Sequence, residues 1–274
     1  MAALAVALAV LPAVALPSAG WAGPPAPITP GVELRTPVGE DVISRCTAGF
    51  VVRGADAVFL AYAAHCTSTS DATGGIDGCT EPALPLGTPV TVFRSDGSPT
   101  LGSLAYSSWL AMQESGETDS DLCLHNDLAL VALEPGDVGA VDPTVPVFGG
   151  PDGLDTDGIQ AGEPVFSYQP NVGPAAPARQ GITLGGSLRN HDVVMVPPPV
   201  EGDSGSGYLD AGGRAVGLLS SGVLLPVAGR PADVNGVSDL AAALAYASEH
   251  GGLGRVELVN GTAPFARVGL PLTP

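Results

Sequence analysis

Strand-length apolar or alternating runs follow one another along the first half of the chain. They are rich in valine and aromatic residues, turn residues separate them, and they cover residues 46–53, 57–63, 89–94, 101–107 and 127–133. Runs of this length and spacing are typical of a closed antiparallel sheet. The pattern therefore predicts a first β-barrel over residues 46–145.

The pattern stops and then resumes in the second half. Residues 134–162 are dense in proline, glycine and aspartate, which predicts a linker. Strand-like runs return at 163–169, 181–188, 192–196, 206–210 and 215–223. A second barrel of similar size over residues 146–274 accounts for them. The predicted fold class is all-β, with two antiparallel barrels.

The two ends of the chain differ from this pattern. Residues 2–16 are apolar and uncharged and lead into small residues near Gly23. This resembles the apolar region and cleavage site of a secretory signal, and it is too short for a comfortable membrane span. We expect a signal peptide at 1–22, a proline-rich N-terminal arm at 23–45 and a secreted, extracellular protein.

One helix is expected near the C-terminus. The residues from Asp239 onward show helical spacing and stop at Gly251 and Gly252, and Ser238 or Asp239 is suited to cap the start. We expect this helix to pack across a barrel.

Composition and charge narrow the function classes. The 38 glycines, 27 prolines and 5% aromatic residues favour turns and short strands. The net charge of −18, with all 10 basic residues arginine, disfavours nucleic acid and anionic membrane as partners. We expect a monomer that does not bind nucleic acid, or membrane once the signal is removed.

The 4 cysteines form an even set in a chain that carries an export signal, which predicts disulfides. Four thiols allow three pairings. A zinc site is the competing interpretation, but the sequence has no CxxC pair and no HxxxH spacing. We expect neither a metal nor a cofactor.

The strongest chemical signal is the segment at 201–207, EGDSGSG, where Ser204 lies among glycines. A serine hydroxyl is a weak nucleophile until a base removes its proton, and the tetrahedral intermediate needs amide donors aimed at its oxyanion. The Gly202 and Ser204 amides are candidates for these donors. The segment predicts an acyl-transfer site.

A base and an orienting acid complete this site. The candidate base is His65, which directly follows an apolar strand and precedes Cys66. The chain has three other histidines, His125, His191 and His250. Asp127 opens the apolar run at 127–133, where its carboxylate can hold the tautomer of His65 and stabilise the imidazolium.

The order His65, Asp127, Ser204, with the segments AAHC, DLAL and GDSGS, resembles the trypsin/chymotrypsin-like serine peptidases, above all their bacterial secreted branch. The likeness covers residues 43–250. It implies two six-stranded β-barrels with the triad in the cleft between them, and a serine endopeptidase that cleaves polypeptides through an acyl-enzyme. It also implies the disulfides Cys46–Cys66 and Cys79–Cys123.

The resemblance assigns further residues. Ser220, Ser221 and Gly222 match the family segment that binds substrate beside the specificity pocket, by addition of a substrate strand. Pro198 stands where trypsin-like members carry an aspartate, so we do not expect cleavage after Lys or Arg. Apolar or small side chains are expected instead, with Glu201 able to bias the preference.

The resemblance also implies that Asp203 is buried. A buried carboxylate without a cation is costly, and the bacterial branch supplies an internal arginine. Our hypothesis is that Arg179 fills this role.

Two alternatives remain. A catalytically impaired peptidase-fold binding protein is suggested by the departures from the family pattern at Tyr62 and Ser206. A serine esterase of the α/β-hydrolase class would use Ser204, Asp239 and His250 in that order, but its G-x-S-x-G motif requires glycine at position 206.

Overall fold

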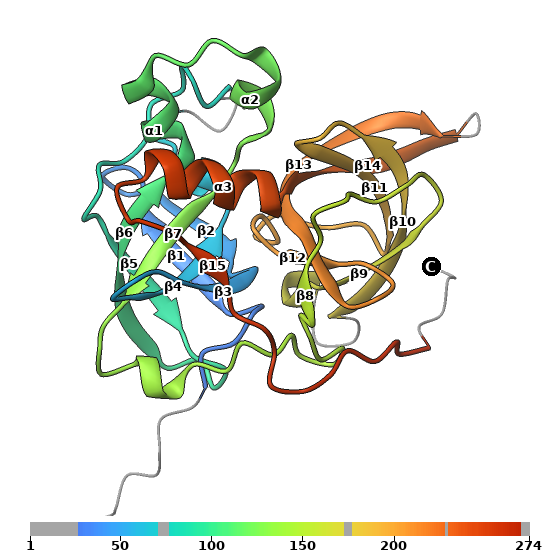
Figure 1. The fold of residues 1–274 in the computed structure, drawn as a ribbon, viewed down its shortest axis with the longest axis horizontal. Helices are drawn as coiled ribbons and strands as arrows, with labels where there is room; N and C mark the ends of the chain where they lie inside the picture. Colours follow the sequence, from blue (N-terminus) through green and yellow to red (C-terminus); the bar gives the residue numbers. More distant parts are fainter. Residues whose placement is uncertain (1–26, 71–76, 173–176, 228–229, 270–274) are drawn as a thin grey trace, which may run out of the picture.

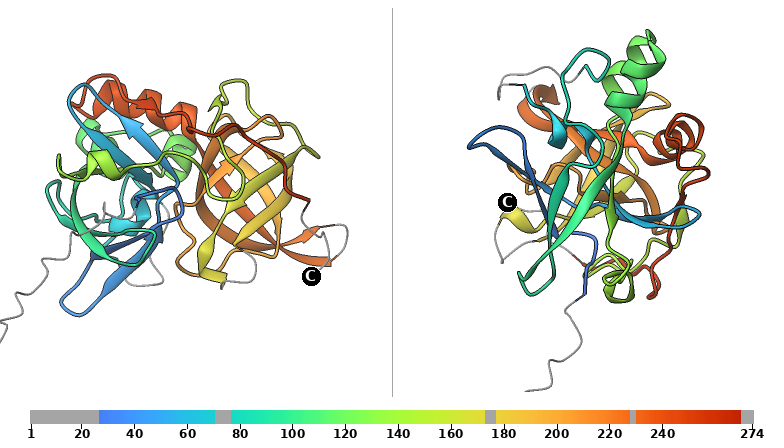
Figure 2. Two further views of the ribbon diagram at one scale, coloured as in Figure 1. Left: turned by 90° about the horizontal axis from the view of Figure 1, so that it is seen from below. Right: turned by 90° about the vertical axis from the view of Figure 1, so that its left-hand side faces the viewer.

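The computed structural model describes residues 27–70, 77–172, 177–227 and 230–269 (Figure 1). The predicted signal peptide lies outside the described residues. Two β-sheets form two barrels side by side, and a helix runs from one onto the other (Figures 1 and 2). The predicted all-β class, with two barrels and a C-terminal helix, is confirmed.

The first sheet has eight strands in the order β15-β3-β4-β7-β6-β5-β1-β2. The chain passes from β2, at one end of this order, through Ala48 and Gly49 directly into β3 near the other end. The strands are β1 (Glu33–Pro37), β2 (Ile43–Thr47), β3 (Phe50–Arg53), β4 (Val58–Tyr62), β5 (Pro89–Phe93), β6 (Pro99–Ser107), β7 (Ala129–Leu133) and β15 (Glu257–Leu258).

The second sheet has seven strands in the order β12-β9-β10-β11-β14-β13-β8, and pairing between β12 and β13 closes a six-stranded barrel within it. Its strands are β8 (Gly153–Leu154), β9 (Pro164–Tyr168), β10 (Ala178–Gly186), β11 (Asn190–Val196), β12 (Gly207–Leu209), β13 (Arg214–Val227) and β14 (Arg230–Asp239). Burial alternates strictly along β11, as expected for a strand with one face in a core.

The three α-helices in the described part are α1 (Ser108–Ser115), α2 (Ser120–His125) and α3 (Leu240–His250), with short 3₁₀ turns at Ala64–Thr67, Val138–Ala140 and Pro170–Val172. α3 is the predicted C-terminal helix, and the Asp239 side chain caps it by accepting from the Ala242 amide at 2.7 Å. No helix in this part of the chain has the length and hydropathy to cross a membrane.

An apolar core joins the two barrels. It contains Phe50 and Leu130 from the first barrel, Phe166 and Leu218 from the second, and Leu240 from α3, all at most 3% exposed. Because the same cluster includes side chains from both sheets, the barrels are packed on each other and the segments between them are held in place.

Three features differ from the sequence predictions. The range 23–45, predicted as an arm, supplies β1 and the start of β2, with Leu34 fully buried. The segment after α3 returns to the first sheet, where β15 pairs with β3. The predicted linker at 134–162 contains β8, and α1, α2 and β14 were not predicted.

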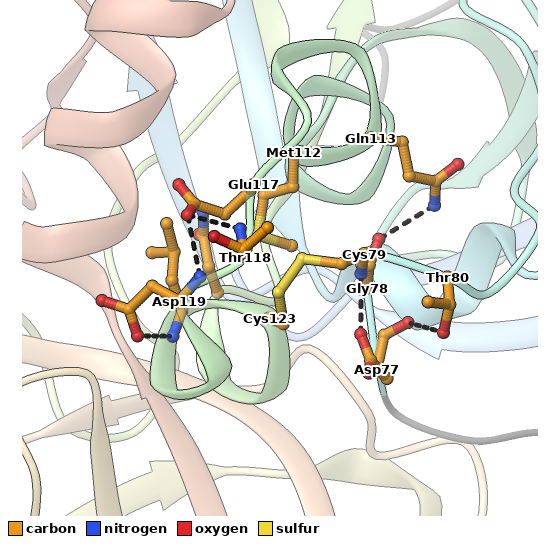
Figure 3. The surroundings of a disulfide bond; sticks show 12 residues. Asp77, Gly78, Cys79, Thr80, Met112, Gln113, Glu117, Thr118, Asp119 and Cys123 are labelled. Atoms are coloured by element: carbon orange, nitrogen blue, oxygen red, sulfur yellow. Dashed lines mark hydrogen bonds between the residues drawn. A yellow bond between two sulfur atoms is a disulfide. The ribbon is translucent and has the colours of Figure 1, made fainter.

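Both disulfides implied by the resemblance are present, Cys46–Cys66 and Cys79–Cys123. The second links the segment before β5 to α2 (Figure 3), where Asp119 caps the helix by accepting from the Asp121 amide at 2.9 Å. The Gly78 amide also donates to the Cys123 carbonyl at 2.8 Å. This bridge therefore fixes α2, the element that directly precedes Asp127.

Removing the second bridge should destabilise the fold. In the Cys79→Ala/Cys123→Ala variant, opening a loop of 44 residues should lower the free energy of unfolding by about 2–5 kcal/mol. Denaturant unfolding measures it. Reductant should lower the midpoint of the native protein more than that of the variant, and equal midpoints for the two oxidised proteins would contradict the role of this bridge.

Candidate active site

His65 and Asp127 are brought together by two neighbouring strands. β4 and β7 pair antiparallel with Tyr62 opposite Ala129. His65 follows the end of β4 and Asp127 precedes the start of β7, so both lie at the same edge of the sheet. His65 Nδ1 lies 2.7 Å from Asp127 Oδ2, and the His65 amide donates to Asp127 Oδ1 at 2.8 Å.

The Asp127 carboxylate is buried but fully engaged. The residue is 3% exposed, and Ser220 from the second barrel donates its hydroxyl to Oδ2 at 2.6 Å. Burial alone would raise the pKa of Asp127, but the charge of His65 and the hydrogen bonds from His65 and Ser220 outweigh it and lower the pKa. Asp127 is therefore held as an anion.

The contact between His65 and Asp127 also changes the pKa of the imidazole. Burial disfavours the charged ring, but attraction and hydrogen bonding to Asp127 outweigh burial, so the pKa of His65 is raised above 6.5. The side chain keeps 24% of its surface exposed. The ring is thus oriented on one side and open on the other, as a general base must be.

Ser204 lies in the turn before β12 and is tied to the first barrel. Its carbonyl accepts from the Thr47 amide at 2.8 Å. The next residue, Gly205, has φ +87°, and a β-carbon there would stand 2.5 Å from the Thr47 carbonyl oxygen and 2.9 Å from the Ala63 amide. Only glycine fits this approach, and it brings Ser204 beside the segment that carries His65.

The serine hydroxyl is not hydrogen-bonded to His65 among the described residues of this structure. Bonds between nucleophile and base are often long in substrate-free enzymes and shorten when the substrate binds. The structure therefore contains the contact between His65 and Asp127 and places Ser204 in the adjoining turn.

Two amides around Ser204 are open. The Asp203 amide donates to the Val200 carbonyl and the Gly205 amide to the Leu219 carbonyl. By contrast, neither the Gly202 nor the Ser204 amide has an acceptor within the described ranges. Two free backbone amides, one of them belonging to the serine itself, are the kind of donors that stabilise an oxyanion.

A free strand edge lies next to these groups. β13 pairs with β12 only as far as Leu218, and the Leu219 amide still donates to the Ser206 carbonyl. From Ser220 through Gly222, the edge of β13 that faces away from β14 has no partner strand in the part of the chain described. An extended peptide can add to such an edge.

Asp203 and Arg179 form a fully buried ion pair. Arg179 Nη2 donates to Asp203 Oδ2 at 2.9 Å, and both side chains are 0% exposed. Arg179 Nη1 also donates to the Pro198 carbonyl at 2.9 Å, and Asp203 Oδ2 accepts from the Val200 amide at 2.9 Å. The pair therefore supports the loop around Ser204 and the segment that contains Pro198, whereas Glu201 is exposed at the surface.

Two residues of this network were missed in the sequence. Asn171 Nδ2 donates to Asp203 Oδ1 and to Thr47 Oγ1, both at 3.1 Å. Thr47 in turn donates its hydroxyl to the Gly202 carbonyl at 2.7 Å. These contacts join the first barrel to the loop that carries the open amides. A lone asparagine and a lone threonine belong to no motif, so no sequence signal marks them.

The α/β-hydrolase alternative is wrong. Its fold requires a parallel sheet with helices on both faces, whereas both barrels here are built of antiparallel strands. Asp239 Oδ2 lies 2.9 Å from His191 Nε2. His250 stacks on Tyr246 instead. Asp239 and His250 therefore do not form the acid–base pair which that alternative needs.

Two groups of metal-ligand side chains lie close together in the described part, Cys46 with His65 and Cys66, and Asp77 with Cys79 and Cys123. All of these cysteines are in disulfides, and the ligand for a metal is the thiolate. In its oxidised state neither group offers the thiolates of a structural zinc site.

Comparison with solved structures identifies the fold. The structure matches Thermobifida fusca protease A with a TM-score of 0.51 and 20% identity, covering 86% of this chain and 100% of that one. It matches a glutamic acid specific serine protease with a TM-score of 0.50 and 17% identity, over 85% and 100% of the two chains. No protein-family model and no curated sequence matches. The chain therefore has the chymotrypsin-like fold of bacterial serine peptidases.

The buried pair predicts a large stability effect. Arg179→Met leaves the Asp203 charge buried without its cation and should lower the free energy of unfolding by about 3–5 kcal/mol. Adding Asp203→Asn should recover part of the loss, because it removes the unpaired charge. Denaturant unfolding of the three proteins measures this.

A surface arginine provides the control. Arg189 lies 3.4 Å from Asp121 with 32% of its side chain exposed, so Arg189→Met should cost at most about 1 kcal/mol. If Arg179→Met were no more harmful than Arg189→Met, the buried pair would not support the loop as described.

Proposed function

We propose that the protein is a secreted serine endopeptidase that hydrolyses peptide bonds with Ser204 as nucleophile, His65 as general base and Asp127 as the orienting acid. The observation that carries the proposal is the double hydrogen bond between His65 and the buried Asp127. It occurs in a fold of serine peptidases, next to a glycine-flanked serine with open amides.

The chemistry follows from these positions. The substrate strand adds to the free edge of β13 at Ser220–Gly222 and presents its carbonyl to Ser204. The exposed side of the His65 ring takes the Ser204 proton as the oxygen attacks, and Asp127 stabilises the resulting imidazolium. The Gly202 and Ser204 amides bind the oxyanion. His65 then gives the proton to the leaving amine as the peptide bond breaks. In the second half, His65 takes a proton from the water that attacks the acyl-enzyme and returns it to Ser204 as the ester bond breaks and the acid product leaves.

Export is part of the proposal. The apolar segment at 2–16 has the composition of a signal, and the two disulfides belong to an oxidising compartment. The net charge of −18 suits a soluble protein whose partner is a polypeptide rather than nucleic acid.

The competing function is a binding protein that has lost activity, suggested by Tyr62 and Ser206. Tyr62 is fully buried, with its hydroxyl 3.5 Å from that of Thr36, and Ser206 is fully buried in the turn before β12. Neither departure removes a group needed for catalysis, so the structure favours the enzyme.

Covalent labelling tests the nucleophile. A serine-directed organophosphonate should label the signal-free protein once, on Ser204, and should fail to label Ser204→Ala. The same variant should lose roughly a millionfold in the rate of peptide hydrolysis. Ser206→Ala is the matched control, since its hydroxyl lies two residues away and is buried, and it should still be labelled. Labelling elsewhere, or hydrolysis that survives Ser204→Ala, would refute the assignment.

A further inference from the structure

A buried amide lies beneath the substrate segment with one atom unsatisfied. Asn235 in β14 is 3% exposed, and its Oδ1 has no hydrogen-bond partner among the described residues. Leaving a buried amide oxygen unpaired costs about 1–3 kcal/mol. Such groups are uncommon in folded proteins, and each calls for an explanation; of those in the described part of the chain, Asn235 Oδ1 is the one directly behind the free β13 edge.

The position of Asn235 shows where a partner can reach it. Gly222, an exposed residue of the free β13 edge, is directly opposite Asn235 in the β13–β14 pair. A β-carbon on Gly222 would stand 3.7 Å from Asn235 Nδ2, and apart from Gly222 and its two chain neighbours no other atom of the described chain lies within 4 Å of it. Because Gly222 has no side chain, the Nδ2 end of the Asn235 amide lies directly behind the free β13 edge, and Oδ1 lies deeper in the barrel.

Apolar core residues lie beside Asn235 in the sheet. On β11, Val193 stands opposite Asn235, and it belongs to the barrel core with Met195, Leu219 and Val237. A charged substrate side chain entering here would lose its hydration without gaining a counter-charge. An apolar side chain would leave the Asn235 oxygen unpaired.

We propose that Asn235 selects substrates with an uncharged amide side chain, glutamine or asparagine, at the residue whose carbonyl Ser204 attacks. The inference rests on the proposed peptidase function. A substrate amide donates an N–H to Asn235 Oδ1, and Asn235 Nδ2 donates to the substrate carbonyl in return. A carboxylate of the same shape cannot make the first bond. This preference differs from the apolar or small preference expected from the sequence.

Matched peptides test the preference. Three fluorogenic peptides differ only in the residue before the cleaved bond, which is glutamine, glutamate or leucine. For the native protein, kcat/KM for the glutamine peptide should exceed that of the other two by about 10- to 100-fold. Asn235→Leu should lose this advantage and cleave the leucine peptide as well as, or better than, the glutamine peptide.

Two further variants make the result decisive. Asn235→Ala removes the same amide without added bulk, and it should also lose the preference. Asn260→Leu alters an exposed amide that bonds to the Asp152 carbonyl, and it should keep the native ranking. Asn235→Leu should unfold at no lower denaturant concentration than the native protein, because no hydrogen bond of Oδ1 is lost.

The outcomes separate this inference from the proposed function. If the organophosphonate labels Ser204 and peptides are cleaved, but the glutamate or leucine peptide is best or the Asn235 variants keep the glutamine preference, this inference alone is wrong. If Ser204 is not labelled and none of the peptides is cleaved, the proposed function is wrong and this inference falls with it.

Discussion

The hydrogen bond between His65 Nδ1 and Asp127 Oδ2 is the interaction on which the site depends. A buried carboxylate must be stabilised by donors, and here they come from both barrels: the amide and ring of His65 from the first, and the Ser220 hydroxyl from the second. Separation of the barrels would leave the anion without one of its three donors. The charge that orients the base therefore also favours the docking of the two barrels.

The second barrel also contains a buried carboxylate that needs donors, and there an arginine supplies them. Arg179 and Asp203 are enclosed where water cannot reach them, and their remaining donors and acceptors bind the backbone at Pro198 and Val200. A buried pair of this kind is weak evidence for net stability, but it specifies one arrangement of the chain around it. That arrangement leaves the Gly202 and Ser204 amides without an acceptor among the residues that the structure describes. Asn171 and Thr47 extend it to the first barrel.

The sequence predicted the parts of this structure in which a motif and a strand end coincide. His65 and Asp127 adjoin apolar strands and Ser204 lies among glycines, but each signal is modest by itself, and the order of the three residues with the segments AAHC, DLAL and GDSGS indicated them together. β1 was missed because its buried Leu34 lies between Glu33 and Arg35 in a proline-rich stretch, where no apolar run stands out. Asn235 could not be found at all, because its importance comes from the register that places it opposite Gly222, and register is a tertiary property.

The most direct test of this account is an NMR titration of the His65 imidazole in the signal-free protein. The account predicts a midpoint above 6.5, because Asp127 favours the protonated ring, and a lower midpoint in Asp127→Asn, where that charge is gone. A native midpoint at or below 6.5 that does not move in Asp127→Asn would contradict the pairing from which the rest of the account follows.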